Sequence, residues 1–156
     1  MKMKKRLISI AMAAVMAVGS IPASDALLDG FNNTSTYSDQ FTDVPSTAWY
    51  YNSVKSAYEL GITAGTSASK FSPDQNLTTD QLTVFLARIH AAYHHNEIVE
   101  VQNPSSWTDK YYYYVEQYID SSYRDSIFGG RDNEQRWHFA YWISKALPDS
   151  AYTAIN

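Results

Sequence analysis

The sequence predicts an all-α protein made of two tandem helix-loop-helix units that follow an export signal. Two observations predict this class: apolar side chains recur every three to four residues in several segments, and these segments repeat at a fixed distance along the chain. Of the 156 residues, 45% are hydrophobic and 18% are charged, which is typical of a folded chain and not of a disordered one.

The first 26 residues have the three parts of a secretory signal peptide. A basic start at Met1–Arg6 precedes an apolar run at Leu7–Val18 that is short for a membrane span, and small residues then form a cleavage region. Cleavage after Ala23 or Ala26 fits this pattern, and a retained anchor is the alternative. We therefore assign residues 1–26 to the signal, and expect a secreted chain with no membrane span after cleavage.

Removal of this signal makes the chain strongly acidic. It takes away four of the 12 basic residues and one of the 16 acidic residues, so the formal net charge changes from −4 to −7. No nucleic-acid partner is expected, because such binding needs a basic surface that displaces counterions. The chain has no cysteine, which excludes disulfides, thiol catalysis and cysteine-zinc sites.

The first repeat unit is assigned to residues 41–96, after an expected flexible leader at residues 27–40 that is rich in Asn, Ser, Thr and Asp. Its first helix is predicted from about residue 48 to residue 60. Three apolar positions at helical spacing mark this helix: Val54, Ala57 and Leu60. Gly61 is expected to end it in a left-handed conformation, with Ile62 covering the last turn.

A second helix of the first unit is predicted to begin at Thr78, because Thr78 and Gln81 have the spacing of a capping box. This helix has the clearest apolar stripe in the chain: Leu82, Phe85, Leu86, Ile89 and Tyr93. It is expected to end near residues 94–96. The loop between the two helices is predicted to be structured, with a turn at Pro73-Asp74 and Phe71 as an apolar plug.

The second unit is assigned to residues 107–156, after a linker at residues 97–106. Trp49 and Trp107 lie 58 positions apart, and an overlay at this distance places apolar or aromatic residues on most core positions of the first unit. A period of this size is typical of repeat architectures, in which each unit covers an apolar face of its neighbour.

Several residues of the first unit match a known repeat in order and spacing: Phe41-x-Asp43-Val44, Trp49, Leu60-Gly61-Ile62, Gly65, Phe71-x-Pro73 and Leu77-Thr78-x-x-Gln81. This pattern resembles the S-layer homology repeat, closely over residues 41–90 and loosely over residues 107–147. The resemblance implies helix-loop-helix repeats, usually three, whose grooves bind the secondary polymer of Gram-positive cell walls. It therefore implies a cell-wall or S-layer associated protein, anchored non-covalently, with an acidic cell-wall glycan as its partner.

The resemblance also implies a carbohydrate-binding site. An Arg in the family's Thr-Arg-Ala-Glu stretch is expected to meet acidic groups of the polymer; Thr79 replaces it in the first unit, and Arg136 retains it in the second. Aromatic rings are expected to stack on sugars. The candidate carbohydrate-binding residues are Arg136, Trp49, Asp43, Gly65, Trp137 and Tyr112. For Asp43 a turn or cap role is the alternative, and for Trp49 and Gly65 it is a packing role.

The second unit departs from the pattern, with Ile119 at the position of Gly61 and only Gly129-Gly130 left as a turn in its loop. Its second helix is expected to be capped by Asp132 and to end before Pro148. A third repeat is missing, so we expect either a piece of a longer protein or a chain that completes its core by self-association. The alternative function is a protein interaction or oligomerisation module without glycan affinity.

No enzyme activity, metal or cofactor is expected from the sequence. His90 and His94 share a helical face, but Ala91 stands where a zinc metalloprotease needs Glu, so a solvated helix end is the preferred interpretation. Paired acids such as Asp125 and Asp132 are interpreted as loop charges, and no nucleophile elbow or phosphate loop is present.

Overall fold

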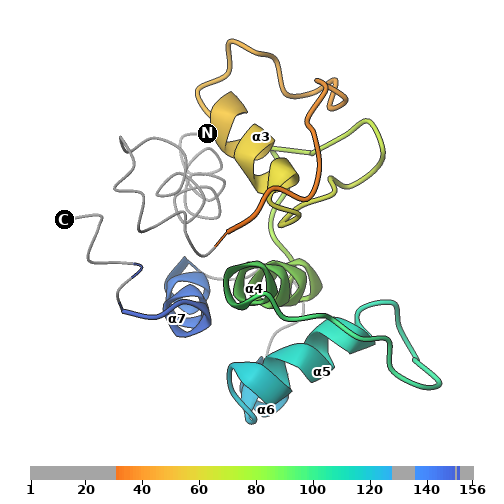
Figure 1. Ribbon diagram of the computed structural model, residues 1–156, viewed down its shortest axis with the longest axis vertical. Coiled ribbons are helices and arrows are strands. Elements are labelled where there is room, and N and C mark those ends of the chain that lie inside the picture. The colour runs from red at the N-terminus through yellow and green to blue at the C-terminus, as the bar shows by residue number, and fades with distance from the viewer. Residues whose placement is uncertain (1–30, 128–135, 150, 152–156) are drawn as a thin grey trace. The chain divides into compact units, whose positions relative to one another are not determined.

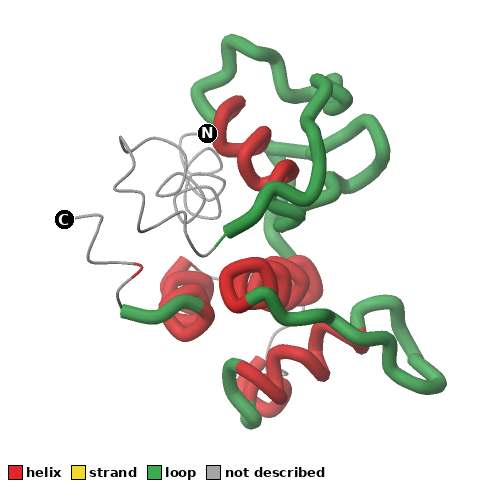
Figure 2. Tube along the Cα trace, viewed as in Figure 1, coloured by secondary structure: helices red, strands yellow, loops and turns green. Residues whose placement is uncertain are grey.

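The computed structural model describes residues 31–127, 136–149 and 151, and within them it contains five helices and no strand. The helices are α3 (Tyr51–Glu59), α4 (Thr79–His94), α5 (Asp109–Tyr118), α6 (Tyr123–Ile127) and α7 (Arg136–Ala146) (Figure 1). Loops connect them, and one isolated β-bridge joins Ser67 and Lys70 (Figure 2). The predicted all-α class is confirmed. The predicted signal peptide lies outside the described residues.

The chain divides into two compact units. Among the described residues, unit 1 contains residues 31–76 and Ala151, and unit 2 contains residues 77–127 and 136–149. In the described parts of both units, no helix has the length and apolar character that a membrane-spanning helix requires.

The core of unit 1 forms around one face of α3. This helix buries Val54 and Ala57, as the apolar stripe predicts. It begins at Tyr51, three residues later than expected, because residues 45–51 form successive tight turns: Ala48 N–H donates to Pro45 O over 2.8 Å, and Tyr51 N–H to Ala48 O over 3.0 Å.

Gly61 ends α3 in the predicted manner. Its φ is 72°, a left-handed conformation that glycine adopts without steric strain. The Gly61 N–H donates to Tyr58 O over 3.0 Å and the Ile62 N–H to Ala57 O over 2.8 Å, which are the two bonds of a Schellman motif. Ile62 is buried beyond them, so the local sequence signal is confirmed.

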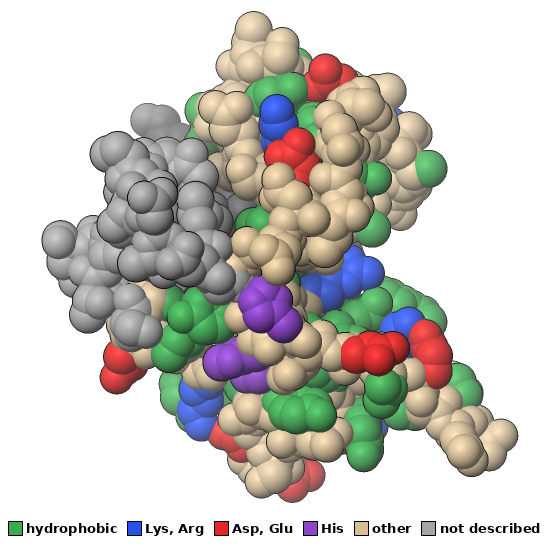
Figure 3. Space-filling model, in the orientation of Figure 1, with side chains coloured by type: hydrophobic (Ala, Val, Ile, Leu, Met, Phe, Trp, Pro, Cys, Tyr) green, Lys and Arg blue, Asp and Glu red, His purple; other side chains and the backbone are tan. Residues whose placement is uncertain are grey.

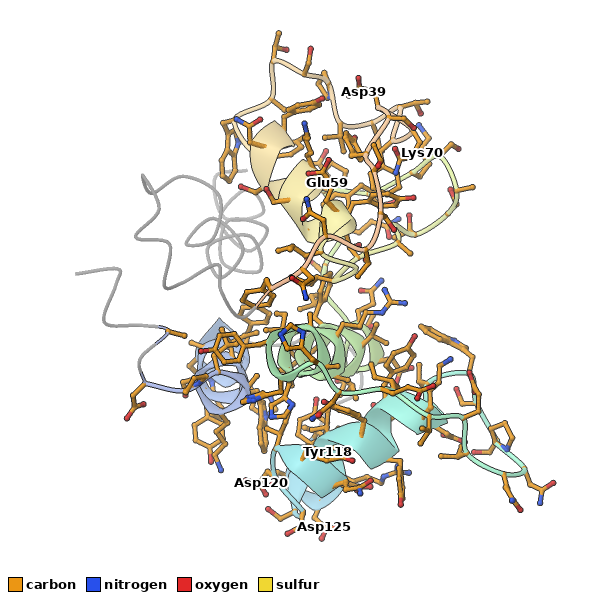
Figure 4. The ribbon with its side chains drawn as sticks, in the orientation of Figure 1. Asp39, Glu59, Lys70, Tyr118, Asp120 and Asp125 are labelled. Atoms are coloured by element: carbon orange, nitrogen blue, oxygen red, sulfur yellow. The ribbon has the colours of Figure 1, made fainter. Side chains whose placement is uncertain are left out.

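Residues 34–40 differ from the flexible leader expected there. The backbone N–H groups of Thr34 and Ser35 donate to the carbonyl of Glu59, which lies at the end of α3 (Figure 4). Tyr37 is buried with Phe41 in the core of unit 1, because this small unit needs aromatic surface from outside its helix. The prediction of a flexible segment was based on its many polar residues and did not take account of Tyr37, which the core buries.

Unit 2 is a helical cluster in which α4 packs against α5 and α7, and α5 packs against α6. The capping box is confirmed: Gln81 N–H donates to Thr78 Oγ1 over 3.2 Å, and Thr78 N–H to Gln81 Oε1 over 3.0 Å. Buried side chains of all four helices form the core: Leu82, Leu86 and Ile89 of α4, Tyr114 and Val115 of α5, Tyr123 and Ile127 of α6, and Phe139, Trp142 and Ile143 of α7.

Helix α4 therefore belongs to the first predicted repeat by sequence and to the second compact unit by packing. Its apolar stripe is covered by α5 and α7, which both come from the second predicted repeat. Residues assigned to the second repeat thus cover an apolar face of a helix assigned to the first, as expected for a small amphipathic helix pair that cannot cover both of its apolar faces.

The second repeat differs from the first after α5. Ile119 follows α5 in a right-handed conformation (φ −113°), since a β-branched residue does not take the left-handed cap of Gly61. The short helix α6 then follows, which the sequence pattern does not predict. Asp120, just after Tyr118 (Figure 4), forms an ion pair with Lys145 of α7 that lowers the pKa of Asp120 to about 2. The predicted Gly129-Gly130 turn and Asp132 cap lie outside the described residues.

Candidate functional site

Asp43 holds the loop that follows α3. Its Oδ1 accepts from Phe71 N–H over 2.9 Å and its Oδ2 accepts from Ser72 N–H over 2.8 Å. Burial of the carboxyl opposes ionisation, but these backbone donors outweigh it and lower the pKa of Asp43. Both carboxylate oxygens thus bind the protein's own backbone, which favours the loop-forming alternative for this residue over direct contact with a ligand.

Gly65 lies where the same loop passes close to the core. Its φ is 78°, and a Cβ at this position would lie 2.5 Å from the carbonyl oxygen of Lys70 and 2.5 Å from the ring of Phe41. The Lys70 carbonyl accepts from Thr66 N–H over 2.8 Å, so the backbone there cannot move freely. Figure 4 labels Lys70 in this loop. Gly65 is therefore a close-packing residue that sets the shape of the loop.

Trp49 is the exposed aromatic side chain of unit 1, with 56% of its surface accessible. Its ring meets Tyr50 edge to face at 5.5 Å between centroids. Burial raises the pKa of Tyr50, and the negative charges of Asp74 and Asp43 act in the same direction. Unit 1 thus presents an exposed indole ring that contacts Tyr50 just before α3.

Tyr112 of α5 is held by contacts from two other helices, α4 and α6. Its hydroxyl donates to Asp80 Oδ1 of α4 over 2.8 Å, and the guanidinium of Arg124 of α6 lies 4.9 Å from its ring centroid. Burial and the bond to Asp80 raise the pKa of Tyr112 to about 12. Since Arg124 approaches the ring, stacking of a sugar on Tyr112 would have to use the other ring face.

Trp137 lies in the first turn of α7 and is 66% exposed, with its ring 5.1 Å from that of His138. Arg136 begins α7, but its side chain lies outside the described part of the chain.

The structure brings Asp43 and Gly65 to the same loop of unit 1, whereas Trp49 lies in the turns that precede α3. Tyr112 and Trp137 belong to unit 2, on different helices. Asp43, Trp49 and Gly65 thus belong to unit 1, and Tyr112, Arg136 and Trp137 belong to unit 2.

The histidines of α4 form a ring cluster. His90 and His94 stack at 4.2 Å between centroids, and His90 Nδ1 lies 3.0 Å from the Tyr114 hydroxyl. Burial lowers the pKa of His90 to about 4, and the positive charge of His94 acts in the same direction. In the described residues, no group of three or more His, Asp or Glu side chains is arranged to hold a metal ion.

Two arginines were missed by the sequence reasoning. Arg88 of α4 and Arg124 of α6 each lie over a tyrosine of α5, Tyr111 and Tyr112 respectively. No local sequence pattern predicts α6, and the position of Arg124 on this helix could therefore not be predicted either.

Comparison with known proteins supports the resemblance. Residues 40–81 match the family model of the S-layer homology domain. A segment of 57 residues is 39% identical to an endoglucanase of Bacillus sp. (strain KSM-635), and the match covers 36% of this chain and 6% of that relative. No solved structure matches the chain.

The S-layer homology resemblance is therefore confirmed over residues 40–81, which contain Asp43, Trp49 and Gly65 and end in the first turn of α4. Domains of this family are, in general, non-catalytic modules that anchor proteins to the cell wall. The matched segment accordingly indicates association with the cell surface.

Proposed function

We propose that this protein attaches non-covalently to the bacterial cell envelope by binding a secondary cell-wall polysaccharide. The observation that carries the proposal is the S-layer homology match over residues 40–81, whose matched residues include an exposed tryptophan, Trp49. No activity is carried over from the endoglucanase, because the match covers 6% of that protein. The protein is proposed as a binding protein that is exported by the signal at residues 1–26.

The proposed contacts with the polysaccharide are of two kinds: stacking of aromatic rings on sugars, and pairing of charged groups. Trp49 and Trp137 are more than half exposed, so each can cover the C–H face of a sugar ring without prior rearrangement. Arg136 is proposed to pair with an acidic group of the polymer through its planar guanidinium. Asp43 and Gly65 act indirectly, because they fix the loop of unit 1 from inside. Tyr112 is proposed to contribute through the part of its side chain that is exposed.

The proposal is tested by sedimentation of the mature protein with purified cell-wall sacculi. One sample keeps the secondary polymer, and a second has had it extracted. We expect the protein to sediment with the intact sacculi and to remain in solution with the extracted ones. Equal sedimentation with both samples would contradict polymer binding and favour the alternative, an interaction module without glycan affinity.

Single substitutions then test the residues. Trp49→Ala and Arg136→Ala are each expected to weaken binding to intact sacculi by about three- to tenfold, since stacking or a charge-assisted bond contributes about 1 kcal/mol. Lys55→Gln is the matched control for charge, because Lys55 is an exposed cation of α3. An Arg136→Ala variant that binds as well as the parent would remove Arg136 from the site.

A further inference from the structure

The last turns of α4 carry two histidines whose rings are in contact. His90 and His94 are four residues apart, so they lie on the same face of the helix, and their ring centroids are 4.2 Å apart. His90 is partly buried and His94 is exposed to solvent. In Figure 3, histidine side chains lie at the surface over α4. We call these two residues the histidine pair.

A tyrosine of α5 fixes the orientation of His90. His90 Nδ1 lies 3.0 Å from the hydroxyl oxygen of Tyr114, and the side chain of Asn96 also bonds to this hydroxyl. The ring of Tyr118 lies 6.3 Å from that of His90, measured between centroids. Histidines that bind metals are commonly held in this way, with one ring nitrogen bonded to a neighbouring group and the other at the metal. In the described residues, no hydrogen bond occupies Nε2 of His90 or either ring nitrogen of His94.

His90 is in the protonation state that a metal ion requires. Metal ions bind the neutral imidazole, and a protonated ring must first lose its proton. Burial lowers the pKa of His90 to about 4, and the positive charge of His94 acts in the same direction. His90 is therefore neutral at neutral pH. When its proton is on Nδ1, this nitrogen donates to the Tyr114 oxygen, and Nε2 keeps a lone pair for a metal ion.

We propose that the histidine pair binds a divalent transition-metal ion. Nε2 of His90 and one ring nitrogen of His94 are the two protein ligands, and water molecules complete the coordination shell. Imidazole nitrogen suits Zn²⁺, Cu²⁺ and Ni²⁺, whereas Ca²⁺ and Mg²⁺ prefer oxygen ligands. The described residues place no third His, Asp or Glu side chain at this position, so the site remains open to a further donor.

The structure changes the interpretation of these histidines as a solvated helix end. The sequence shows their spacing on α4, but only the packing of α4 against α5 places Tyr114 beside His90. A metal ion held by both rings links two successive turns of α4, and the bond from His90 to Tyr114 connects this link to α5. Because only the folded chain holds the two rings together, the bound metal ion stabilises unit 2.

The test titrates zinc chloride into the mature chain, prepared without a histidine tag, and measures binding by isothermal titration calorimetry. The parent is expected to bind one Zn²⁺ per chain. His90→Gln and His94→Gln are each expected to weaken binding by about tenfold or more, because each removes one of the two protein ligands. Tyr114→Phe keeps the aromatic ring but loses the bond to His90, and is expected to weaken binding by about tenfold.

Two further measurements use the same proteins. Excess zinc chloride is expected to raise the melting temperature of the parent by about 3 °C at about pH 7.5, and by less at about pH 5, where protons compete with the metal ion for imidazole nitrogen. In nitrogen-15 NMR spectra, the ring signals of His90 and His94 are expected to shift when Zn²⁺ is added, and those of His95 are not.

The matched control is His95→Asn. His95 is exposed and follows His94 directly, with a φ of 55° that Asn tolerates. This variant is expected to bind Zn²⁺ within twofold of the parent. Calcium chloride is the control for the metal, and is expected not to bind at the histidine pair, because Ca²⁺ prefers oxygen ligands. His94 is exposed, and an unchanged circular dichroism spectrum without metal would show that His94→Gln remains folded.

Each contrary result overturns the metal site. A parent that does not bind Zn²⁺ lacks the site altogether. If folded His94→Gln binds Zn²⁺ within twofold of the parent, the ion is held elsewhere, and equal weakening by His95→Asn and His94→Gln also excludes the histidine pair. The proposed attachment to the cell envelope is independent of these results, because sedimentation with sacculi is measured without added metal.

Discussion

Single residues in the matched segment have roles that their sequence positions alone did not distinguish. Asp43 and Gly65 act inside the protein, on the loop after α3, whereas Trp49 is exposed to solvent. Under the proposed function, a polymer would contact the ring of Trp49 directly and would depend on the other two only through the loop that they shape. Stability measurements can separate these roles, because a loop-forming residue affects unfolding even without ligand.

Gly65→Ala is expected to destabilise unit 1 by about 2 kcal/mol or more, because the new Cβ meets a backbone carbonyl and the Phe41 ring, at a φ that L residues rarely adopt. Gly61→Ala is the matched comparison: its φ is 72°, but its Cβ meets only the Thr34 side chain, at 2.8 Å from Oγ1, which can rotate. Urea unfolding measures both. A Gly61 variant that is less stable than the Gly65 variant would contradict the packing argument.

Asp43→Asn is expected to lower the free energy of unfolding by about 1 kcal/mol at pH 7, because an amide oxygen replaces two charge-assisted acceptors with one neutral acceptor. The lowered pKa of Asp43 stabilises the fold above its ordinary value of 3.8, and this stabilisation is lost as the pH falls toward the lowered value. The difference between parent and variant should therefore shrink below about pH 4.

Urea unfolding at pH 7 and at pH 3 checks this dependence. Asp74→Asn serves as control, because Asp74 is exposed and lies in the same loop. A difference between parent and Asp43→Asn that is as large at pH 3 as at pH 7 would show that the carboxylate charge is not its source.

The start of α4 and the end of α3 lie where short-range signals predict, whereas the buried faces of the helices depend on their neighbours. The capping box begins α4 one residue after Thr78, and the left-handed Gly61 follows α3. On α5, Tyr111, Tyr114 and Val115 are buried as their shared face predicts, but Tyr118 is exposed. The packing of α4 against α5 also encloses His90, a titratable group that the apolar stripe does not reveal.

His90 is expected to make unit 2 less stable at mildly acidic pH. The pKa of His90 is lowered from 6.5 to about 4 by burial and by His94, so the unfolded chain binds a proton more readily than the folded one. Stability should therefore fall as the pH decreases from about 6.5 to about 4, and stay constant at this site below that range. The groups that face His90 are Tyr114 and Tyr118 of α5 and His94 of α4.

Melting temperatures between pH 7.5 and pH 4.5 test this expectation. His90→Gln can still bond to Tyr114 but does not titrate, so its melting temperature should change less with pH than that of the parent. His95→Asn is the control, because His95 is exposed and has a φ of 55° that Asn tolerates. Parallel pH curves for the parent and His90→Gln would rule out His90 as the sensor.

In the molecule as a whole, the compact units do not follow the sequence repeat. The repeat predicts a division near residues 97–106, whereas the chain divides between Asn76 and Leu77, so that α4 joins the second half. The reason is the apolar face of α4, which α5 and α7 cover. The S-layer homology match crosses this division and ends at Gln81.

A chain shortened to end at Asn96 is expected to lose the structure of α4, because Leu82, Leu86 and Ile89 would lose the helices that bury them. By circular dichroism, the shortened chain should contain less helix than α3 and α4 together contribute in the full chain. On gel filtration it should self-associate. The control is the full chain at the same concentration. Cooperative unfolding of the shortened chain as a monomer would show that the first repeat folds alone.

Much of the fold could be predicted because its signals are local. A capping box, a glycine at a helix end and an apolar stripe each act through neighbours within a few residues, so Thr78, Gly61 and Leu82 could be interpreted without coordinates. The candidate site was less predictable. Asp43 and Phe71 are 28 residues apart, and Arg88 and Tyr111 are 23 apart, so their contacts depend on chain reversals that no short pattern encodes.

The sequence by itself determined the helical class, the ends of α3 and α4, and the S-layer homology resemblance, because these depend on spacing along one segment. Only the tertiary structure decided that Tyr37 belongs to the core, that α4 packs with the second half, and that two cations meet at Tyr111. These features depend on which surfaces are buried together, and burial is settled by competition among all segments of a unit for the same apolar neighbours.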